Sequence, residues 1–260
     1  GSAEELMNAI DQLHQNGIGA ILDFVPAHFA LDDYSLRKYD GSSLYEYPHD
    51  DVGISEWGSC NFMHSRGEVR SFLQSSCNYW LSEYHFDGIR MDAVSRLIYW
   101  QGDERRGENK AAIDFLKNMN AGLKSRHSEI MLIAEDSTDY PQVTTDVNSG
   151  GLGFDYKWDL GWMHDTLEYF QSLPKERTDK YHKLTFSMMY FKNENYLLPF
   201  SHDEVVHGKA SILQKMSGEY EDKFPQGRAL YMYMMVHPGK KLNFMGNEFA
   251  QFIEWDYKKA

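Results

Sequence analysis

The sequence has little of what disulfide-stabilised, membrane-spanning or secreted proteins need. Only two cysteines, Cys60 and Cys77, occur in 260 residues, which indicates reduced thiols rather than a disulfide framework. The longest apolar runs, 18–25 and 230–236, fall well short of the roughly 20 residues that cross a bilayer. The first residues lack the basic stretch and apolar core of a signal peptide. We therefore expect no membrane partner and a cytoplasmic location.

Positive charge is also scarce. Lys and Arg number 26 against 39 Asp and Glu, so the net charge is −13 at pH 7. A surface of this sign repels phosphate backbones, and nucleic acid is not an expected partner. Hydrophobic residues make up 42% of the chain and aromatic residues 15%, which is ample material for a packed globular core.

Strand and helix patterns alternate along the chain. Ser2 and Glu5 form a capping box that begins a helix, and Asn16-Gly17 ends it. Strands are predicted at 18–25, 88–91, 130–134, 153–156, 196–200 and 242–245, and helices at 68–84, 112–123, 160–170 and 227–236. Strands that alternate with helices are typical of a parallel sheet, and eight such units close into a barrel.

Six predicted strands are two fewer than a (β/α)8 barrel contains. Either two strands escape the pattern, or the sequence is part of a longer barrel. We favour the second explanation, because the sequence begins inside a helix and stops soon after a strand. The predicted fold is therefore α/β, with residues 1–260 forming one partial β/α barrel domain that lacks the first two strands and the last helix. The stretch 26–62 has no clear period, and a loop this long is usually functional.

Acidic and histidine side chains recur near the ends of predicted strands. Asp23 and Arg90 lie inside two of the strands, and His28, Asp92, Glu135, Asp136, His202, Asp203 and Glu204 follow the strands. In a β/α barrel, the residues at the carboxyl ends of the strands line the ligand site. A single acid in such a place is more often a helix cap. Four strands with the same pattern favour a site, because charges gathered at one rim are costly to bury.

Two carboxyl groups on neighbouring strands suit the cleavage of a glycosidic bond. One group donates a proton to the leaving oxygen, and the other attacks or stabilises the cationic sugar. Neighbouring strands lie about 4.8 Å apart, which is compatible with the carboxyl separation of about 5–5.5 Å in retaining enzymes. The residue types therefore favour retaining glycosidic chemistry.

Four segments resemble the four signature regions of the α-amylase family of glycoside hydrolases, in their usual order. They are 23–28 (DFVPAH), 88–93 (GIRMDA), 134–137 (AEDS) and 200–204 (FSHDE). The resemblance implies that Asp92 is the nucleophile and Glu135 the general acid/base. It also implies that Asp203 is the carboxylate that holds substrate hydroxyls, more strongly in the transition state.

The same resemblance implies substrate-binding roles for four more residues. Arg90 would orient Asp92 and keep it ionised, His28 and His202 would bind the sugar in the reacting subsite, and Asp23 would brace the site. A metal is not expected, because the histidines and cysteines show no zinc-binding spacing. The glycines at 150–153 do not form a dinucleotide fingerprint and are expected in a loop, so no cofactor is expected either.

Three longer stretches resemble the branching transferases of this family in particular. They are 153–166, 201–209, and 245–251 with Glu254 and Trp255. The resemblance implies cleavage of an α-1,4 link and transfer of the glucan to a 6-hydroxyl, with α-1,4-glucan (glycogen, amylose or starch) as donor and acceptor. Such enzymes carry further N- and C-terminal domains, which are expected partners of this chain. Two alternatives stay open: an α-glucan hydrolase, and a catalytically silent fragment that at most binds glucan.

Several other residues are less informative. Trp57, Trp100 and Trp162 could lie in the core or at the rim of the site, where a ring can stack on a sugar. The apolar residues of 231–235 recur at helical spacing and are expected in the core. The charged run 103–108 is expected to be a solvated loop.

Overall fold

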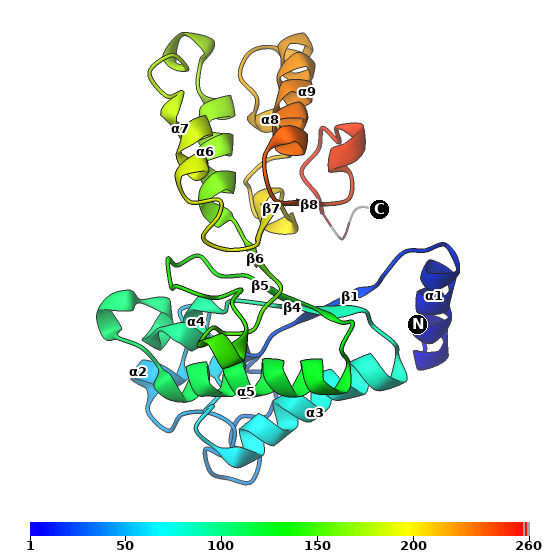
Figure 1. Cartoon of the computed structure of the whole chain (residues 1–260), viewed down its shortest axis with the longest axis vertical. Helices are drawn as coiled ribbons and strands as arrows, with labels where there is room; N and C mark the ends of the chain where they lie inside the picture. The colour runs from blue at the N-terminus through cyan, green and yellow to red at the C-terminus, as the bar shows by residue number, and fades with distance from the viewer. Residues whose placement is uncertain (257, 259–260) are drawn as a thin grey trace. The chain divides into compact units, whose positions relative to one another are not determined.

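The computed structural model describes residues 1–256 and 258, and the chain forms two compact units, Gly1–Lys157 and Trp158–Ala260 (Figure 1). Each unit has parallel strands, helices and a hydrophobic core of its own. Strand β6 (Tyr156–Trp158) contains the boundary between them. Within the described residues, no helix has the length and apolar character needed to span a membrane.

The first unit contains a parallel sheet in the order β1-β4-β5-β6. Its other strands are β1 (Ile21–Phe24), β4 (Gly88–Met91) and β5 (Met131–Ala134). The register places Asp23 beside Arg90. Because paired residues on parallel strands point to the same face of a sheet, this register directs both side chains to one side.

The helices of the first unit are α1 (Ala3–Gln15), α2 (Asp50–Gly53), α3 (Gly67–Glu83), α4 (Ser95–Ile98) and α5 (Lys110–Arg126). Three of them, α1, α3 and α5, lie close to their predicted positions, and the short helices α2 and α4 were not predicted. The capping box at Ser2 is confirmed, since Ser2 Oγ accepts the Glu5 N–H and the Glu5 carboxylate accepts the Ser2 N–H. Helices α3 and α5 lie side by side (Figure 1) and share one core with β4 and β5, in which Cys77 and Phe115 are fully buried.

The stretch 26–62 is mostly irregular, as predicted, but it also contains a small antiparallel pair. Strand β2 (His28–Phe29) pairs with β3 (Cys60–Asn61), which aligns His28 with Asn61. Short 3-10 helices η1 (Trp100–Gly102) and η2 (Glu104–Arg106) follow α4. The charged run 103–108 is largely exposed, as expected, although part of it is the helix η2.

The first predicted strand is shorter and more exposed than the apolar run 18–25 suggested. A nearly continuous apolar run of this kind is usually buried on both faces of a parallel sheet, but Ile21 is 47% exposed and Val25 42%. Among the residues that the structure describes, β1 pairs with β4 alone, so it has a neighbour on one side only. Strand β6 also begins later than the predicted 153–156, because Gly153, at φ +81°, belongs to a turn closed on the Thr145 carbonyl.

The second unit contains the parallel pair β7 (Tyr196–Phe200) and β8 (Lys240–Asn243). Its helices are α6 (Leu160–Gln171), α7 (His182–Thr185), α8 (Ile212–Lys215) and α9 (Tyr220–Val236). Further 3-10 helices in the two units are η3 (Val147–Ser149), η4 (Pro174–Glu176), η5 (Phe186–Met189), η6 (His202–Glu204) and η7 (Asn247–Phe249). Strand β8 lies two residues before the predicted 242–245. Among the residues that the structure describes, six strands run parallel, which agrees with the six predicted.

Helix α9 differs from the prediction in length and in burial. It begins at Tyr220 rather than at residue 227, because a capping box at Glu219 starts it and Pro225 does not interrupt it. Met234 is fully buried, but Met232 is 70% exposed and Met235 62%, so the expectation that 231–235 lies in the core is wrong for these two. Their spacing places them on a different side of the helix from Met234.

Candidate active site

Arg90 is the centre of a cluster of acidic side chains in the first unit. Its Nη1 lies 2.6 Å from Asp23 Oδ1 and 3.1 Å from Asp92 Oδ1, and its Nη2 lies 2.9 Å from Glu135 Oε2. The Arg90 side chain is only 7% exposed, whereas those of Asp92 and Glu135 are 28% and 18% exposed. One buried guanidinium therefore holds three carboxylates that belong to, or directly follow, three neighbouring strands.

The charge of Arg90 is maintained by these contacts. Burial by itself would lower the pKa of Arg90, but the carboxylates of Glu135, Asp23 and Asp92 together raise it above its ordinary value. Arg90 is consequently a permanent cation, and its planar fork of donors fixes the direction in which the acids point. The arrangement holds the Asp92 carboxyl group beside that of Glu135, with one cation between them.

Backbone hydrogen bonds fix Glu135 against the segment that follows Asp92. Ala93 donates its N–H to Glu135 Oε2 (2.9 Å), Val94 donates to the Glu135 carbonyl (2.8 Å), and Glu135 donates to the Met91 carbonyl (3.0 Å). Ala93 has φ +49°, an uncommon conformation for a residue with a Cβ. This turn of the chain directs the Ala93 N–H back to the carboxylate.

Asp136 follows Glu135 but has a different environment. Its carboxylate is 0% exposed and lies 2.8 Å from Lys157 Nζ on β6, which is 5% exposed. It also accepts hydrogen bonds from the backbone and hydroxyl of Thr138. Since consecutive residues at a strand end point in opposite directions, Glu135 faces Arg90 while Asp136 forms a buried ion pair in the core.

His28 lies on β2, next to an aromatic side chain. Its ring centroid is 5.3 Å from that of Trp57, at an interplanar angle of 45°. Burial lowers the pKa of His28 below its ordinary value, Asp92 opposes that shift, and Arg96 adds to it. The lowered pKa favours the neutral ring near pH 7, which can donate to one hydroxyl from one nitrogen and accept from another hydroxyl at the second nitrogen.

His202 and Asp203 belong to the second unit, on η6 directly after β7. His202 Nε2 lies 3.3 Å from Asp203 Oδ1, and the two side chains are 43% and 46% exposed. Gly208 and Ala210 donate their N–H groups to the Glu254 carboxylate at 2.7 and 2.8 Å. These hydrogen bonds connect the stretch 201–209 and the residue after it to Glu254, so two of the stretches singled out in the sequence are in contact. These two bonds lower the pKa of Glu254.

The first unit thus brings four of the predicted site residues into direct contact: Asp23, Arg90, Asp92 and Glu135. His28 interacts electrostatically with Asp92. Sequence reasoning missed the Ala93 N–H and the side chain of Arg96, which follows the nucleophile candidate by four residues, about one helical turn. In the described part of the chain, no three His, Cys, Asp or Glu side chains are grouped as metal ligands.

Comparison with known proteins identifies relatives of the chain. Residues 57–258 match the family model described as the catalytic domain of alpha amylase. The chain is 52% identical over 257 residues to the 1,4-alpha-glucan branching enzyme GlgB of Fusobacterium nucleatum, covering 99% of the chain and 42% of that protein. It is 50% identical over 256 residues to the enzyme of the same name from Bacillus subtilis, covering 98% of the chain and 41% of that protein. The chain therefore spans about 40% of the length of these curated relatives.

Solved structures show the fold to which the chain is similar. The alpha-amylase of Geobacillus thermoleovorans matches 99% of the chain, and 57% of that protein, with a TM-score of 0.71 at 16% sequence identity. This likeness confirms the predicted fold class, an α/β barrel of the (β/α)8 type, of which the described part of the chain contains six parallel strands.

Proposed function

The chain belongs to the α-amylase catalytic-domain family, and we propose that it is the catalytic part of a 1,4-α-glucan branching transferase. The observation that carries this proposal is the buried Arg90 guanidinium with Asp23, Asp92 and Glu135 around it. The choice of branching within the family rests on relatives of about 50% identity that bear that name. We propose that residues 1–260 belong to a single catalytic barrel domain.

Asp92 acts as the nucleophile in this proposal. Its carboxylate attacks the anomeric carbon of the donor glucan, and a covalent glycosyl-enzyme forms with inversion at that carbon. Arg90 holds the Asp92 carboxylate in position, since a charge-assisted hydrogen bond of 3.1 Å restricts it to one direction. The 6-hydroxyl of an acceptor chain then attacks the same carbon, and the second inversion restores the original configuration.

Glu135 acts as the general acid and then as the general base. It protonates the leaving glucan oxygen in the first step and removes the proton of the acceptor hydroxyl in the second. Oε2 already accepts the Ala93 N–H and faces Arg90 Nη2. The proton that Glu135 donates is therefore carried by its other oxygen, Oε1.

The remaining residues bind the sugar. His28 and His202 hydrogen-bond the hydroxyls of the reacting glucose unit, and Asp203 holds hydroxyls whose geometry changes in the transition state. Asp23 braces Arg90 at 2.6 Å. Transfer to a second glucan instead of to water requires a bound acceptor and a site that excludes water.

The substrates that this proposal implies are α-1,4-glucans such as glycogen, amylose or starch, as donor and as acceptor. Further domains of the whole enzyme would act together with this chain. We place the reaction in glycogen synthesis in the cytoplasm, in agreement with the free thiols of Cys60 and Cys77.

The test of the proposal is incubation of amylose with the longest natural protein that carries this sequence. Branching lowers the iodine colour and produces few new reducing ends, because each cleaved bond is replaced by an α-1,6 link. Release of many reducing ends would assign the chain to the hydrolases of the family. Glucan binding without any turnover would show that it is catalytically silent.

Substitution of the nucleophile tests the mechanism. Asp92→Ala should lower both transfer and hydrolysis by about 10⁴-fold or more, because no covalent intermediate forms. Asp114→Ala is the matched control, since Asp114 is 60% exposed and pairs with Arg70 outside the cluster. Turnover by Asp92→Ala at the level of this control would refute the assignment.

A further inference from the structure

Trp57 differs from the other tryptophans whose place the sequence left open. Trp162 is 1% exposed, in the core of the second unit, and Trp100 is partly buried against Tyr47. Trp57 is 57% exposed and lies beside His28. A large apolar ring left in solvent next to a sugar-binding candidate indicates a contact surface, because aromatic faces pack against the C–H face of a pyranose.

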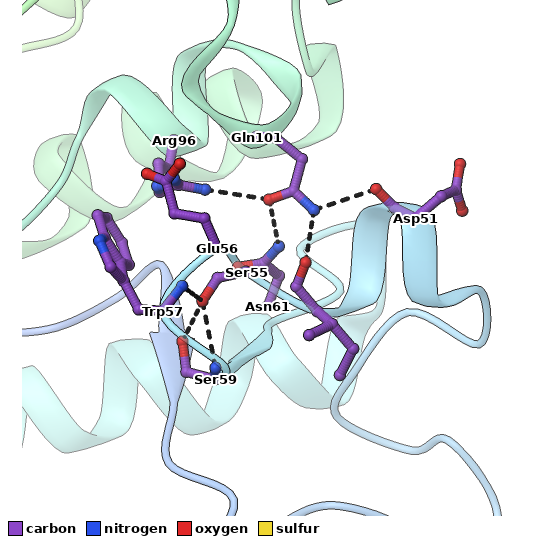
Figure 2. A network of polar contacts seen from close by, with 9 residues as sticks. Asp51, Ser55, Glu56, Trp57, Ser59, Asn61, Arg96 and Gln101 are labelled. Atoms are coloured by element: carbon purple, nitrogen blue, oxygen red, sulfur yellow. Dashed lines mark hydrogen bonds and ion pairs between the residues drawn. The ribbon is translucent and has the colours of Figure 1, made fainter.

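The backbone that carries Trp57 is held rigidly (Figure 2). Ser55 and Ser59 close a turn through the Ser55 N–H to the Ser59 carbonyl (2.8 Å) and through their hydroxyls (2.6 Å). The Trp57 N–H donates to Ser55 Oγ at 3.2 Å. Ser55 is 4% exposed and Ser59 8%, while Gly58 supplies the left-handed φ of +72°. Two buried serines thus support an exposed tryptophan.

A buried arginine fixes the indole ring itself. The guanidinium carbon of Arg96 lies 4.0 Å from the Trp57 ring centroid, in the range of a cation–π contact. The Arg96 side chain is 7% exposed and donates hydrogen bonds to the carboxylate of Glu56 and to Gln101 Oε1 (3.0 Å). The orientation of the ring is therefore set before any ligand binds.

Gln101 anchors this arginine to the surrounding loops (Figure 2). Its Oε1 accepts from Arg96 and from Asn61 Nδ2 (3.1 Å), and its Nε2 donates to the carbonyls of Asp51 (3.1 Å) and Ile54 (2.8 Å). Gln101 has φ +59°, a backbone conformation that costs free energy and persists only where surrounding contacts impose it. All of these groups belong to the first unit, in which Arg96 follows Asp92 by four residues.

We propose that Trp57 stacks on a glucose unit of the α-glucan next to the sugar bound at His28, and that Arg96 and Gln101 are the positioning residues that hold the indole. The inference rests on the proposed function, since it takes α-glucan as the ligand. Glu56, whose side chain is 68% exposed, adds a carboxylate beside the ring that accepts hydrogen bonds from sugar hydroxyls. An apolar ring beside a carboxylate matches the two kinds of surface that a pyranose presents.

The first experiment compares Trp57→Ala and Trp57→Phe in the longest natural protein that carries this sequence. Trp57→Ala should raise the KM for amylose about tenfold, a factor equivalent to 1.4 kcal/mol, and leave kcat within about twofold. Trp57→Phe keeps a flat ring and should raise KM about threefold. Tyr79→Ala is the control, because Tyr79 is a 49% exposed aromatic residue of helix α3, and its KM should not change.

The second experiment tests the positioning role. Arg96→Lys keeps the charge but loses the planar fork, so KM should rise as in Trp57→Ala, and the double variant should be no worse than Trp57→Ala alone. A purely structural Arg96 would lower Tm and leave KM unchanged, which would overturn this role.

Calorimetric titration with maltoheptaose separates failure of this inference from failure of the proposed function. Weaker binding by Trp57→Ala than by the unaltered protein is the expected result. Equal KM and equal maltoheptaose affinity in Trp57→Ala, with normal branching, would overturn the stacking role and leave the proposed function standing. Absence of both turnover and maltoheptaose binding in the unaltered protein would overturn both.

Discussion

His64 should make the stability of the first unit depend on pH. The residue is 3% exposed, its Nε2 lies 2.8 Å from the Pro26 carbonyl, and its ring packs 5.1 Å from that of Phe115. Burial lowers the pKa of His64 from 6.5 to about 4; the hydrogen bond to Pro26 opposes the shift and Arg70 adds to it. The folded protein therefore keeps this histidine neutral where the unfolded chain would bind a proton.

The size of the effect follows from these two values. Well above pH 6.5 the histidine is neutral in both states and contributes no pH dependence. As the pH falls below 6.5, His64 becomes protonated in the unfolded chain but stays neutral in the folded protein, so the free energy of unfolding decreases. The decrease is about 2 kcal/mol at pH 5 and about 3 kcal/mol at pH 4, where the folded state begins to be protonated as well.

Urea unfolding at pH 7.5 and at pH 5 measures this contribution. His64→Gln retains a donor for the Pro26 carbonyl but does not titrate, so it should lose about 2 kcal/mol less between the two pH values than the unaltered protein. Phe115→Leu removes the ring contact without changing a titrating group. It should therefore be less stable than the unaltered protein by the same amount at both pH values. Equal pH dependence of His64→Gln and the unaltered protein would refute the reasoning.

Two further substitutions test buried charges. Arg90→Met should lower kcat by about 10²-fold or more, because it removes the cation that orients the nucleophile. Arg105→Met is the control, since the Arg105 side chain is 90% exposed, and it should leave kcat unchanged. Equal kcat values for the two variants would contradict the role of the cluster. Lys157→Met leaves the Asp136 carboxylate buried without its cation, which costs about 3–5 kcal/mol and should lower Tm by roughly 10 °C in a thermal melt. An unchanged Tm would show that this ion pair contributes no stability.

The sequence predicted those strands whose positions follow from the pattern of neighbouring residues. Strands β4 and β7 have the predicted bounds, because each is a short stretch of mainly apolar residues, with Arg90 the one charged residue in β4, and polar residues follow each strand. The grouping of Asp23, Arg90 and Asp92 followed from the rule that carboxyl ends of parallel strands share one edge. The exposure of β1 did not follow, since an apolar run is buried only where partners cover it, and the run itself does not encode them.

The conformation of the segment after Asp92 was beyond sequence reasoning for a different reason. An alanine at φ +49° costs about 1–2 kcal/mol, and the residue type gives no indication that Ala93 adopts this conformation. The turn persists because it directs the Ala93 N–H to Glu135 and leads the chain into α4, which carries Arg96. The same few residues therefore couple the nucleophile candidate to the acid/base candidate on one side and to the Trp57 ring on the other. That coupling depends on backbone dihedral angles, whereas periodicity and residue spacing report only which side chains share a face.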